Sequence, residues 1–375
     1  GEAYVRGVAF YEEHKDKEQD IKDIAAKLYL GTPSEEWDIF EYAKKINIEY
    51  FLAITKSLGS EFDGLIYESE AGTVGEKVVK DNIGKVFTES EGAIVYIPEE
   101  ERKDINTAVF INSQGHPTYE AKDLGLIELK FSKYSPDYSF FVTDTEQTSH
   151  FKVVLASLEK INSNDAEKSI HIPHGRMTFK GEKMSSRLGG VPLVTDILSV
   201  VEEEVKNKEG DKTKDFTEEE KKELYKNVSL AALRFAILRS KLGGNINFDP
   251  ETTLSFEGDS GPYLQYTFAR TQSLLAKGKD NGYSPQFSTP SLTIVEQKLM
   301  YFEGVVVRAI EEISPQHIVT YLIELAQEFN SFYGSTPIVV EGDETSAHRL
   351  AIVESVSKTL KRGLELLAIV APNKM

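Results

Sequence analysis

The chain has 375 residues, of which 40% are hydrophobic, and a formal net charge of −18 from 43 basic and 61 acidic residues. This length predicts two or three domains, each with its own core. Cysteine is absent and the seven histidines form no H-x-x-x-H pair, which excludes disulfides and thiolate metal sites and predicts no bound structural metal. There is no run of about eighteen apolar residues and no basic-then-apolar leader, so we expect a cytoplasmic protein without a membrane span.

The acidic charge is concentrated early in the chain. Residues 1–105 hold 13 basic and 24 acidic residues, a net charge of −11, whereas residues 225–280 hold seven basic and five acidic residues, a net charge of +2. The overall balance argues against indiscriminate nucleic-acid binding. A nucleic acid that does bind is therefore expected on the later part of the chain.

The first 105 residues are expected to form an acidic α+β segment. Residues 1–30 predict helix, and a second helix is expected to start near Ser34, where the acidic residues that follow suit the helix dipole, and to end before Gly59. Short strands are expected at 62–67 and 93–97. The side chains expected to be buried along the second helix are Trp37, Phe40, Ala43, Ile46 and Ile48.

A strand–helix–strand–helix pattern follows. Residues 107–111 and 138–143 predict strands, and residues 119–131 and 147–158 predict helices. This alternation predicts a βαβ unit with a parallel sheet, in which ligands lie beyond the carboxyl ends of the strands. The polar residues expected at that edge are Tyr119, Asp123 and Gln147.

A basic loop bracketed by glycines spans residues 171–190. Its four cations and its hydroxyl groups suit a bound polyanion, and Gly181, Gly189 and Gly190 give the backbone permissive hinges. For the short run Lys-Met-Ser-Ser alone, a solvated surface loop is an equally good interpretation. The residues that attract attention are Arg176, Lys180, Lys183, Ser185, Ser186 and Arg187.

The last third of the chain predicts an all-α bundle. Residues 202–223 form a charge run that is typical of a linker between domains. Beyond this run, apolar stripes predict a helix from Leu224 to a stop at Gly243-Gly244, and two further helices at 314–334 and 346–369.

Five segments in one order together resemble arginyl-tRNA synthetase, a class I aminoacyl-tRNA synthetase. Any one of them is a weak signal, but five in the family's order make a specific one. The segments are 115–123, 146–151, 171–175, 183–186 and 255–270, and the closing residues 371–375 also resemble the family.

The resemblance implies a fold and an activity. The fold is the second half of a Rossmann-like α/β catalytic domain with its KMSKS-type loop at 106–222, preceded by a connective insert at 1–105 and followed by an α-helical anticodon-binding domain at 223–375. The activity is ATP-dependent activation of L-arginine to arginyl-adenylate, with Mg²⁺ accompanying the nucleotide, and transfer to tRNA(Arg). The resemblance also implies a full-length protein that is a monomer in the cytoplasm.

The resemblance assigns roles residue by residue. Asp123 would accept the arginine guanidinium through charge-assisted hydrogen bonds, while Tyr119 and Gln147 would hold the rest of the amino acid. The ATP site would comprise His171, Gly175, Met177 and Lys183, with Lys183, Ser185 and Ser186 as catalytic residues. The tRNA would be contacted by Arg234, Tyr263, Tyr266, Arg270 and Met375, although helical spacing predicts that about half of Tyr263, Tyr266 and Phe268 belong to the core.

Several departures from the family qualify this interpretation. The His-x-Gly-His signature and the amino-terminal tRNA-contacting domain are absent, so we expect a carboxyl-terminal portion that is inactive by itself. Lys122 replaces a common Arg, and Asp144-Thr145 stands before Glu146-Gln147 where smaller residues are usual. Two alternatives remain open: a tRNA-binding module without catalysis, and a class I ligase for another amino acid such as cysteine or glutamate.

Overall fold

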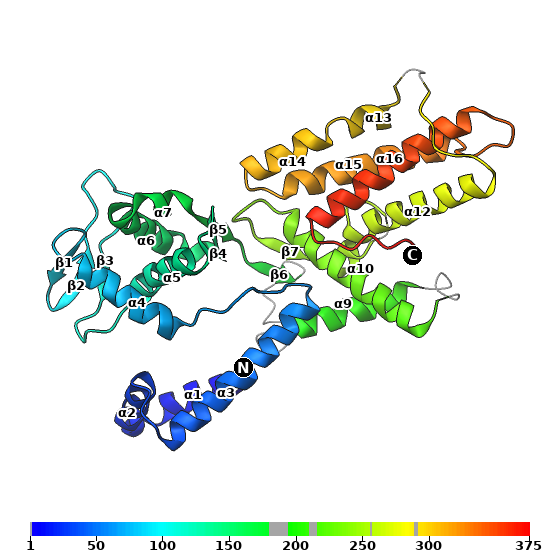
Figure 1. Cartoon of the computed structure of the whole chain (residues 1–375). Coiled ribbons are helices and arrows are strands. Elements are labelled where there is room, and N and C mark those ends of the chain that lie inside the picture. Colours follow the sequence, from blue (N-terminus) through cyan, green and yellow to red (C-terminus); the bar gives the residue numbers. More distant parts are fainter. Residues whose placement is uncertain (1, 180–193, 210–215, 256, 289–291) are drawn as a thin grey trace. The chain divides into compact units, whose positions relative to one another are not determined.

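The computed structural model describes residues 2–179, 194–209, 216–255, 257–288 and 292–375 (Figure 1). Contacts divide them into two units. The first unit contains residues 2–64 and 194–197, and the second contains residues 65–179 and the described residues from 198 onward. No helix in the described ranges is long and apolar enough to cross a membrane.

The first unit is helical, with α1 (Glu2–Glu13), α2 (Glu18–Tyr29) and α3 (Glu35–Ser57). The Ser34 side chain caps α3 by accepting a hydrogen bond from the Trp37 amide at 3.2 Å, which confirms the expected helix start. The expected burial along α3 is wrong, because none of its residues is buried and Phe40 and Ile46 are 41% and 45% exposed. In its own unit α3 packs mainly against the helix α2, and this contact leaves none of the α3 residues buried.

Residues 61–67 connect to the second unit without regular structure, so the strand expected at 62–67 is wrong. The strand expected at 93–97 is β2 (Ala93–Tyr96), which lies between β1 (Phe87–Ser90) and β3 (Ala108–Ile111) in an antiparallel sheet. Gly92, with φ of 81°, permits the tight turn between the first two strands. This sheet buries three aromatic rings against one another, from Phe87, Tyr96 and Phe110.

The parallel pairing occurs one element later than the sequence predicts. We expected the strand at 107–111 to pair in parallel with the strand at 138–143, but the first of these, β3, pairs antiparallel with β2. The parallel partner of β4 (Ser139–Asp144) is β5 (Ser169–His174). The connection runs through α6 (Thr148–Ile161) and the short helix α7 (Ser163–Lys168). The βαβ unit is therefore β4–α6–α7–β5, and the carboxyl ends of its strands meet at one edge.

Side chains of β4 alternate between the core and the exposed face. Phe141 is buried against Phe151 of α6, with ring centroids 5.3 Å apart, whereas Phe140 and Val142 are 46% and 63% exposed. One face of this strand is thus covered and the other carries apolar side chains in the open.

The helices α4 (Glu68–Asp81) and α5 (Tyr119–Tyr134) approach each other closely through small residues. A methyl group added at Gly125 would lie 1.9 Å from the carbonyl oxygen of Ala71, and one added at Gly75 would lie 1.8 Å from that of Ala121. Only hydrogen fits at these two positions, so the glycines set the distance between the helices and thereby the position of α5.

The charge run at 202–223 is mostly helical, so the linker interpretation is wrong for its described residues. The helix α9 (Val194–Glu209) covers its beginning and α10 (Glu218–Leu238) covers its end, while residues 210–215 lie outside the described residues. Two apolar residues four positions apart, Val201 and Val205, bury one face of α9. A capping box between Thr217 and Glu220 starts α10.

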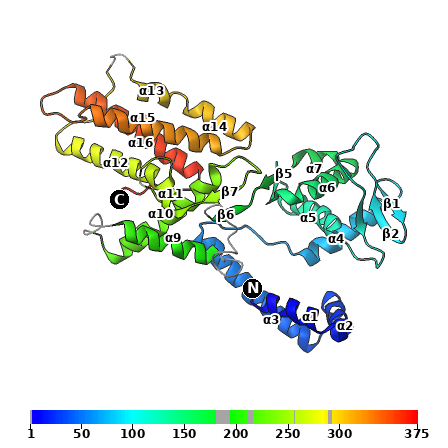
Figure 2. The ribbon, with the colours of Figure 1, turned by 180° about the vertical axis from the view of Figure 1, so that it is seen from behind.

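The last part of the chain packs as a helical bundle, as the sequence predicts. In both Figures 1 and 2, α12, α15 and α16 run side by side, and contacts join each pair of them. The expected stripes on α15 and α16 are buried, including Leu322 and Leu360 at 0% exposure. The helices here are α11 (Pro250–Thr253), α12 (Gly261–Asp280), α13 (Ile294–Leu299), α14 (Phe302–Glu311), α15 (Gln316–Ser335) and α16 (Thr345–Leu366).

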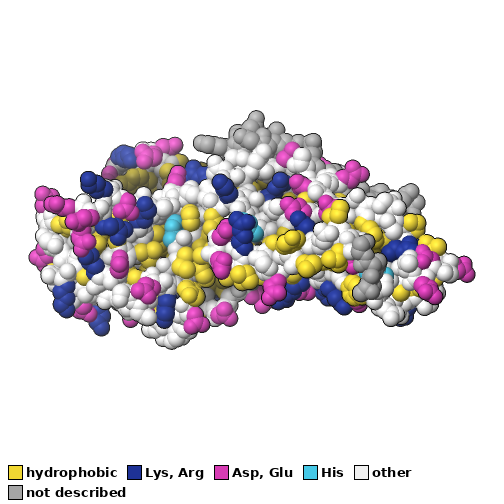
Figure 3. All heavy atoms as spheres, turned by 90° about the horizontal axis from the view of Figure 1, so that it is seen from above, with side chains coloured by type: hydrophobic (Ala, Val, Ile, Leu, Met, Phe, Trp, Pro, Cys, Tyr) yellow, Lys and Arg dark blue, Asp and Glu magenta, His cyan; other side chains and the backbone are white. Residues whose placement is uncertain are grey.

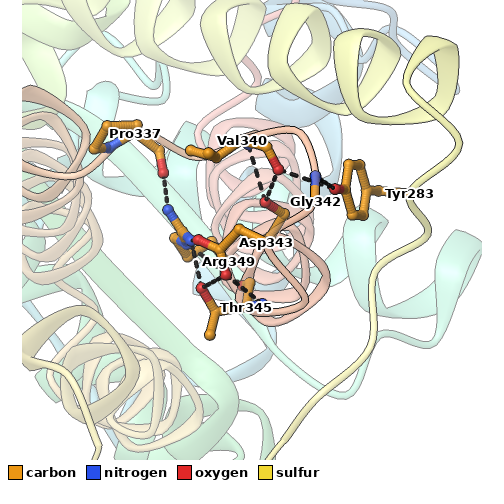
Figure 4. Close-up of polar contacts among 8 residues, drawn as sticks. Tyr283, Pro337, Val340, Gly342, Asp343, Thr345 and Arg349 are labelled. Carbon is orange, nitrogen blue, oxygen red and sulfur yellow. Dashed lines mark hydrogen bonds and ion pairs between the residues drawn. The ribbon is translucent and has the colours of Figure 1, made fainter.

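Figure 4 shows the polar contacts that hold the loop between α15 and α16. The Tyr283 hydroxyl donates to the carbonyl of Val340 and accepts from the amide of Gly342, both at 2.9 Å. Arg349 donates to the carbonyl of Pro337 and to the carboxylate of Asp343. These contacts tie the loop to α16 and to the residues after α12, because they satisfy backbone groups that have no partner in a helix or sheet.

We predict that Gly125→Ala strongly destabilises the second unit. The added methyl group would overlap the backbone of α4, and the helices would have to separate at a cost of at least about 2 kcal/mol in the free energy of unfolding. Gly304→Ala in α14 is the matched control, because a methyl group there meets nothing within 4 Å. The control should be stabilised by up to about 1 kcal/mol. Urea unfolding measures both, and equal stabilities would contradict the close-approach interpretation.

Candidate functional site

The candidate site lies where β4 and β5 end. The register from Ser139↔Ser169 to Asp144↔His174 brings the last residues of both strands to the same edge. A short 3-10 helix, Thr145–Gln147, follows β4 and leads directly into α6. Gln147 is exposed at the start of α6, and His150 lies one turn further along that helix. This edge is where parallel sheets place their ligands.

Asp123 of α5 reaches this edge through His150. The Nε2 atom of His150 lies 2.5 Å from Oδ2 of Asp123, and its Nδ1 atom lies 3.4 Å from Oε1 of Glu120. The side chains are 14% exposed for His150, 26% for Asp123 and 24% for Glu120. A partly buried pair of carboxylates thus faces one imidazole, an arrangement that suits a cationic ligand.

Electrostatics keep His150 charged. Burial lowers its pKa, but the hydrogen bonds to Asp123 and Glu120 outweigh burial and raise the pKa to about 9. Burial raises the pKa of Glu120, and the hydrogen bond from His150 reverses that effect so that the pKa is lowered overall. The sequence had marked His150 as part of a matching run without assigning it a role.

Tyr119 is the first residue of α5 and is 69% exposed. It shares a helix face with Asp123 because the two are four residues apart. The ammonium group of Lys122 lies 5.2 Å from the centroid of the Tyr119 ring and also 3.0 Å from Oε2 of Glu68. The phenol is therefore available to a ligand on the face that Asp123 occupies.

His171 lies on β5 and stacks on the ring of Phe151, with centroids 4.5 Å apart. Its Nε2 atom is 2.8 Å from the hydroxyl oxygen of Thr143 on the neighbouring strand. Burial lowers the pKa of His171, and the charge of His150 lowers it further. A neutral imidazole is therefore favoured at this position.

Gly175 is buried where the chain leaves β5 for β6 (Met177–Phe179). A methyl group there would lie 2.2 Å from the carbonyl oxygen of Gly244. The amide of Gly243 donates to the carbonyl of Pro173 at 3.0 Å, and the amide of Arg176 donates to Oδ1 of Asn245 at 3.1 Å. The turn at 243–245 therefore clamps the segment for which the family resemblance implies contact with adenine.

This clamp continues into a second parallel strand pair. Met177, which is partly buried, opens β6, and β6 pairs with β7 (Ile246–Phe248) of the segment after α10. Sequence reasoning had used Gly243 and Gly244 only as a helix stop, although α10 already ends at Leu238. No sequence signal could have found the contact, because 69 residues separate Asn245 from Arg176.

Arg176 connects the same segment to the end of β4. Its Nη2 atom lies 2.6 Å from Oε1 of Glu146, and its Nε atom lies 3.4 Å from Oδ2 of Asp144. The backbone amide of Glu146 and, to a smaller extent, Arg176 lower the pKa of Asp144. These ion pairs bring the turn before Gln147 next to the segment that contains Gly175. The catalytic residues expected at Lys183, Ser185 and Ser186 lie outside the described residues.

The helical bundle holds the residues expected to contact tRNA. The guanidinium carbon of Arg270 lies 4.8 Å from the ring centroid of Tyr266 and 5.3 Å from that of Tyr333, and the guanidinium donates to Oδ1 of Asn330 at 2.5 Å. Asn330 in turn donates to the Tyr263 hydroxyl at 2.9 Å. The guanidinium of Arg270 thus lies within cation–π distance of two rings, and Tyr333, which is 38% exposed, leaves ring surface on which an unpaired base could stack.

Other expected tRNA residues have internal partners. Arg234 donates to the carbonyl of Ala368, and burial lowers its pKa. Phe268 is 2% exposed and belongs to the core, so helical spacing was right that some of these aromatics are structural. The Gln265 amide donates to the carbonyl of Val370 at 2.7 Å and holds the segment that leads to Met375. In the view of Figure 3, acidic and basic side chains are interspersed among the described residues.

We predict that the imidazole of His150 titrates near pH 9 and that Asp123→Asn moves its pKa towards 6.5. Because the folded-state pKa is raised, the stabilisation by this cluster is complete below pH 6.5 and is lost as the pH rises towards 9. The loss is up to about 3 kcal/mol in the free energy of unfolding. A side-chain NMR titration measures the pKa, and a value near 6.5 in the unsubstituted protein would contradict the ion pair.

Comparison with known proteins matches both parts of the chain to families. The model for tRNA synthetases class I (R), catalytic domain, matches residues 14–249, and the DALR anticodon binding domain matches residues 264–375. Arginine–tRNA ligase from Pediococcus pentosaceus is 30% identical over 100% of this chain, and the enzyme from Lactobacillus johnsonii is 31% identical over 98%. The chain spans 66% of the length of each relative.

Solved structures agree. Arginyl-tRNA synthetase from Thermus thermophilus superimposes with a TM-score of 0.80 at 25% identity, covering 100% of this chain and 69% of that one. Arginyl-tRNA synthetase from Plasmodium falciparum gives 0.76 at 17% identity, covering 98% and 63%, and so supports the fold. The catalytic-domain model matches more than half of the chain, and the resemblance seen in the sequence is confirmed: the chain belongs to the class I arginyl-tRNA synthetases.

Proposed function

We propose that this chain supplies the larger part of an arginine–tRNA ligase, which activates L-arginine with ATP and transfers it to tRNA(Arg). The observation that carries the proposal is the partly buried pair Asp123 and Glu120 at the carboxyl end of β4, in a chain that aligns over its whole length with arginine–tRNA ligases. The chain spans 66% of the length of those relatives. We therefore propose that catalysis also requires the remaining part of the enzyme, which the relatives contain.

Arginine recognition in this proposal rests on Asp123. A guanidinium presents several donors in one plane, and a carboxylate accepts two of them side by side. Tyr119 is exposed on the same helix face, and Gln147 is exposed at the start of α6, so both are available to the remainder of the amino acid. Lysine would be disfavoured because its ammonium group leaves part of the acceptor set unpaired.

Activation in this proposal takes place beside the clamped segment. His171, Gly175 and Met177 would border the adenine, in a segment whose backbone is held by the close packing of Gly175 against Gly244. The arginine carboxylate attacks the α-phosphorus of ATP and pyrophosphate leaves, while Lys183 neutralises negative charge on the triphosphate and the hydroxyls of Ser185 and Ser186 donate to it. A ribose hydroxyl of tRNA(Arg) then attacks the arginyl carbonyl and AMP departs.

Magnesium would accompany the triphosphate in this scheme. Among the described residues, no group of three or more His, Cys, Asp or Glu side chains is placed to hold a metal ion. Magnesium can be held mainly by the phosphates of the nucleotide rather than by protein side chains. The proposed residue roles do not depend on the metal.

The tRNA would bind the helical bundle through the aromatic-cation cluster of Arg270, Tyr266 and Tyr333. Tyr263, Arg234 and Met375 are proposed as further contacts to the tRNA. Residues 225–280 carry a net charge of +2, which agrees with tRNA binding to the later part of the chain. Binding of tRNA without catalysis is the second candidate function. It is tested separately because the chain spans 66% of the length of the relative from Pediococcus pentosaceus.

The exchange of pyrophosphate into ATP tests the catalytic proposal. With arginine, tRNA(Arg) and the complementary piece from the same genome supplied as a separate polypeptide, we expect exchange with arginine and none with lysine, cysteine or glutamate. Asp123→Asn should raise the KM for arginine, and Lys183→Ala should lower the rate about 10²- to 10³-fold. Ser149→Ala, at an exposed position of α6, is the control and should retain full rate. No exchange in the complete mixture would overturn the proposal.

Filter binding tests the tRNA proposal. We expect Arg270→Ala to weaken tRNA(Arg) binding by about tenfold at low salt, because a stacked cation contributes roughly 1 to 2 kcal/mol. Lys358→Ala removes an exposed cation of α16 and should leave the affinity almost unchanged. Binding that persists unchanged in Arg270→Ala would exclude the cluster as the contact site.

A further inference from the structure

His150 is hydrogen-bonded to Asp123, the carboxylate that is proposed to bind the guanidinium of arginine. Its Nε2 atom is 2.5 Å from Oδ2 of Asp123, and its Nδ1 atom is 3.4 Å from Oε1 of Glu120, so the ring bridges both acids of α5. On its own helix it lies edge-on to the ring of Phe151, with centroids 5.3 Å apart. From β5 the titratable group that faces it is His171, whose own pKa is lowered by burial and by the charge of His150.

The protonated ring of His150 competes with any incoming cation for the carboxylate of Asp123. With His150 protonated, the two carboxylates and the imidazolium carry a net charge of −1. A guanidinium that approaches Asp123 would find one carboxylate oxygen already taken and a second cation within contact distance of the same group. Two cations at one partly buried carboxylate repel each other, because the low local dielectric screens them weakly.

Deprotonation of His150 would remove this repulsion. A proton can leave His150, which turns the imidazolium into a neutral ring that no longer repels the guanidinium. The neutral ring can still donate one hydrogen bond to a carboxylate. In the empty site the imidazolium holds Asp123 in place, and in the occupied site the guanidinium would take over that charge pairing.

We propose that binding of a guanidinium ligand at Asp123 is coupled to release of the proton from His150, so that His150 is a positioning residue for the carboxylate. This inference rests on the proposed function, because it takes arginine as the ligand. It goes beyond that function in assigning a role to His150 and a pH dependence to arginine affinity.

The direction of the pH dependence follows from linkage. In the empty site the pKa of His150 is about 9, so the ring is protonated at pH 7.5. A bound guanidinium lowers this pKa, and binding therefore releases up to one proton. Arginine affinity should rise with pH between 7 and 8.5, by up to about tenfold per pH unit.

Isothermal titration with arginine at pH 7.5 tests the coupling in the protein assembled as for the exchange assay. Titrations in phosphate and in Tris, which differ in ionisation enthalpy, report the number of protons released. We expect release of up to one proton for the unsubstituted protein and almost none for His150→Gln, whose arginine affinity should also be nearly independent of pH. His317→Gln, which alters another histidine–glutamate pair at Glu312, is the matched control and should behave like the unsubstituted protein.

An NMR titration of His150 with and without saturating arginine keeps the test independent of the variant's folding. We expect arginine to lower the pKa of His150 by at least one unit. Arginine binding without proton release, or with an unchanged His150 pKa, would overturn this inference and leave the proposed function standing. If arginine does not bind at all, the proposed function fails and this inference fails with it.

Discussion

Parallel pairing of β4 with β5 is the constraint on which the candidate site depends. Two parallel strands in register must end at the same edge, and here that edge brings the end of β4, the start of α6 and the turn after β5 together. The groups at the edge come from segments that are well separated in the chain. Arg176 then links two of those segments through Asp144 and Glu146, so the edge is held by ion pairs as well as by the sheet.

The position of α5 depends on a second constraint, the contact of Gly75 with Gly125. Because the backbones of α4 and α5 almost touch there, α5 has little freedom to slide or rotate. The helix therefore holds Asp123 and Glu120 against His150 of α6. A carboxylate site built on packed helices keeps its geometry better than one on a loop.

The turn after α10 supports the site through its backbone and through the side chain of Asn245. Residues 243–245 follow α10 and clamp the backbone around Gly175, and β7 then pairs with β6. The segment assigned to adenine is thus supported from the same part of the chain that carries the candidate tRNA residues. A tertiary contact of this kind joins the segment around Gly175 to the turn that follows α10.

The sequence by itself determined the kinds of elements and the family. Helical periodicity located α15 and α16 with their buried faces, because each such helix buries one stripe against neighbours. The sequence also located the helix α5. The ordered short motifs identified the arginyl-tRNA synthetases. Local patterns gave wrong predictions where pairing or packing partners decide the outcome. The strand β3 lies in an antiparallel sheet, and no residue of α3 is buried. The described residues of the charge run at 202–223 are mostly helical.

Only the tertiary structure decided which side chains meet. The pairing of Asp123 with His150, 27 residues away, and of Arg176 with Asn245, 69 residues away, has no periodic signature, because neither pair shares an element. Residues on one element are related by a fixed repeat that the sequence displays. Residues on different elements are related only by how those elements pack, and that depends on close contacts such as the one between Gly75 and Gly125.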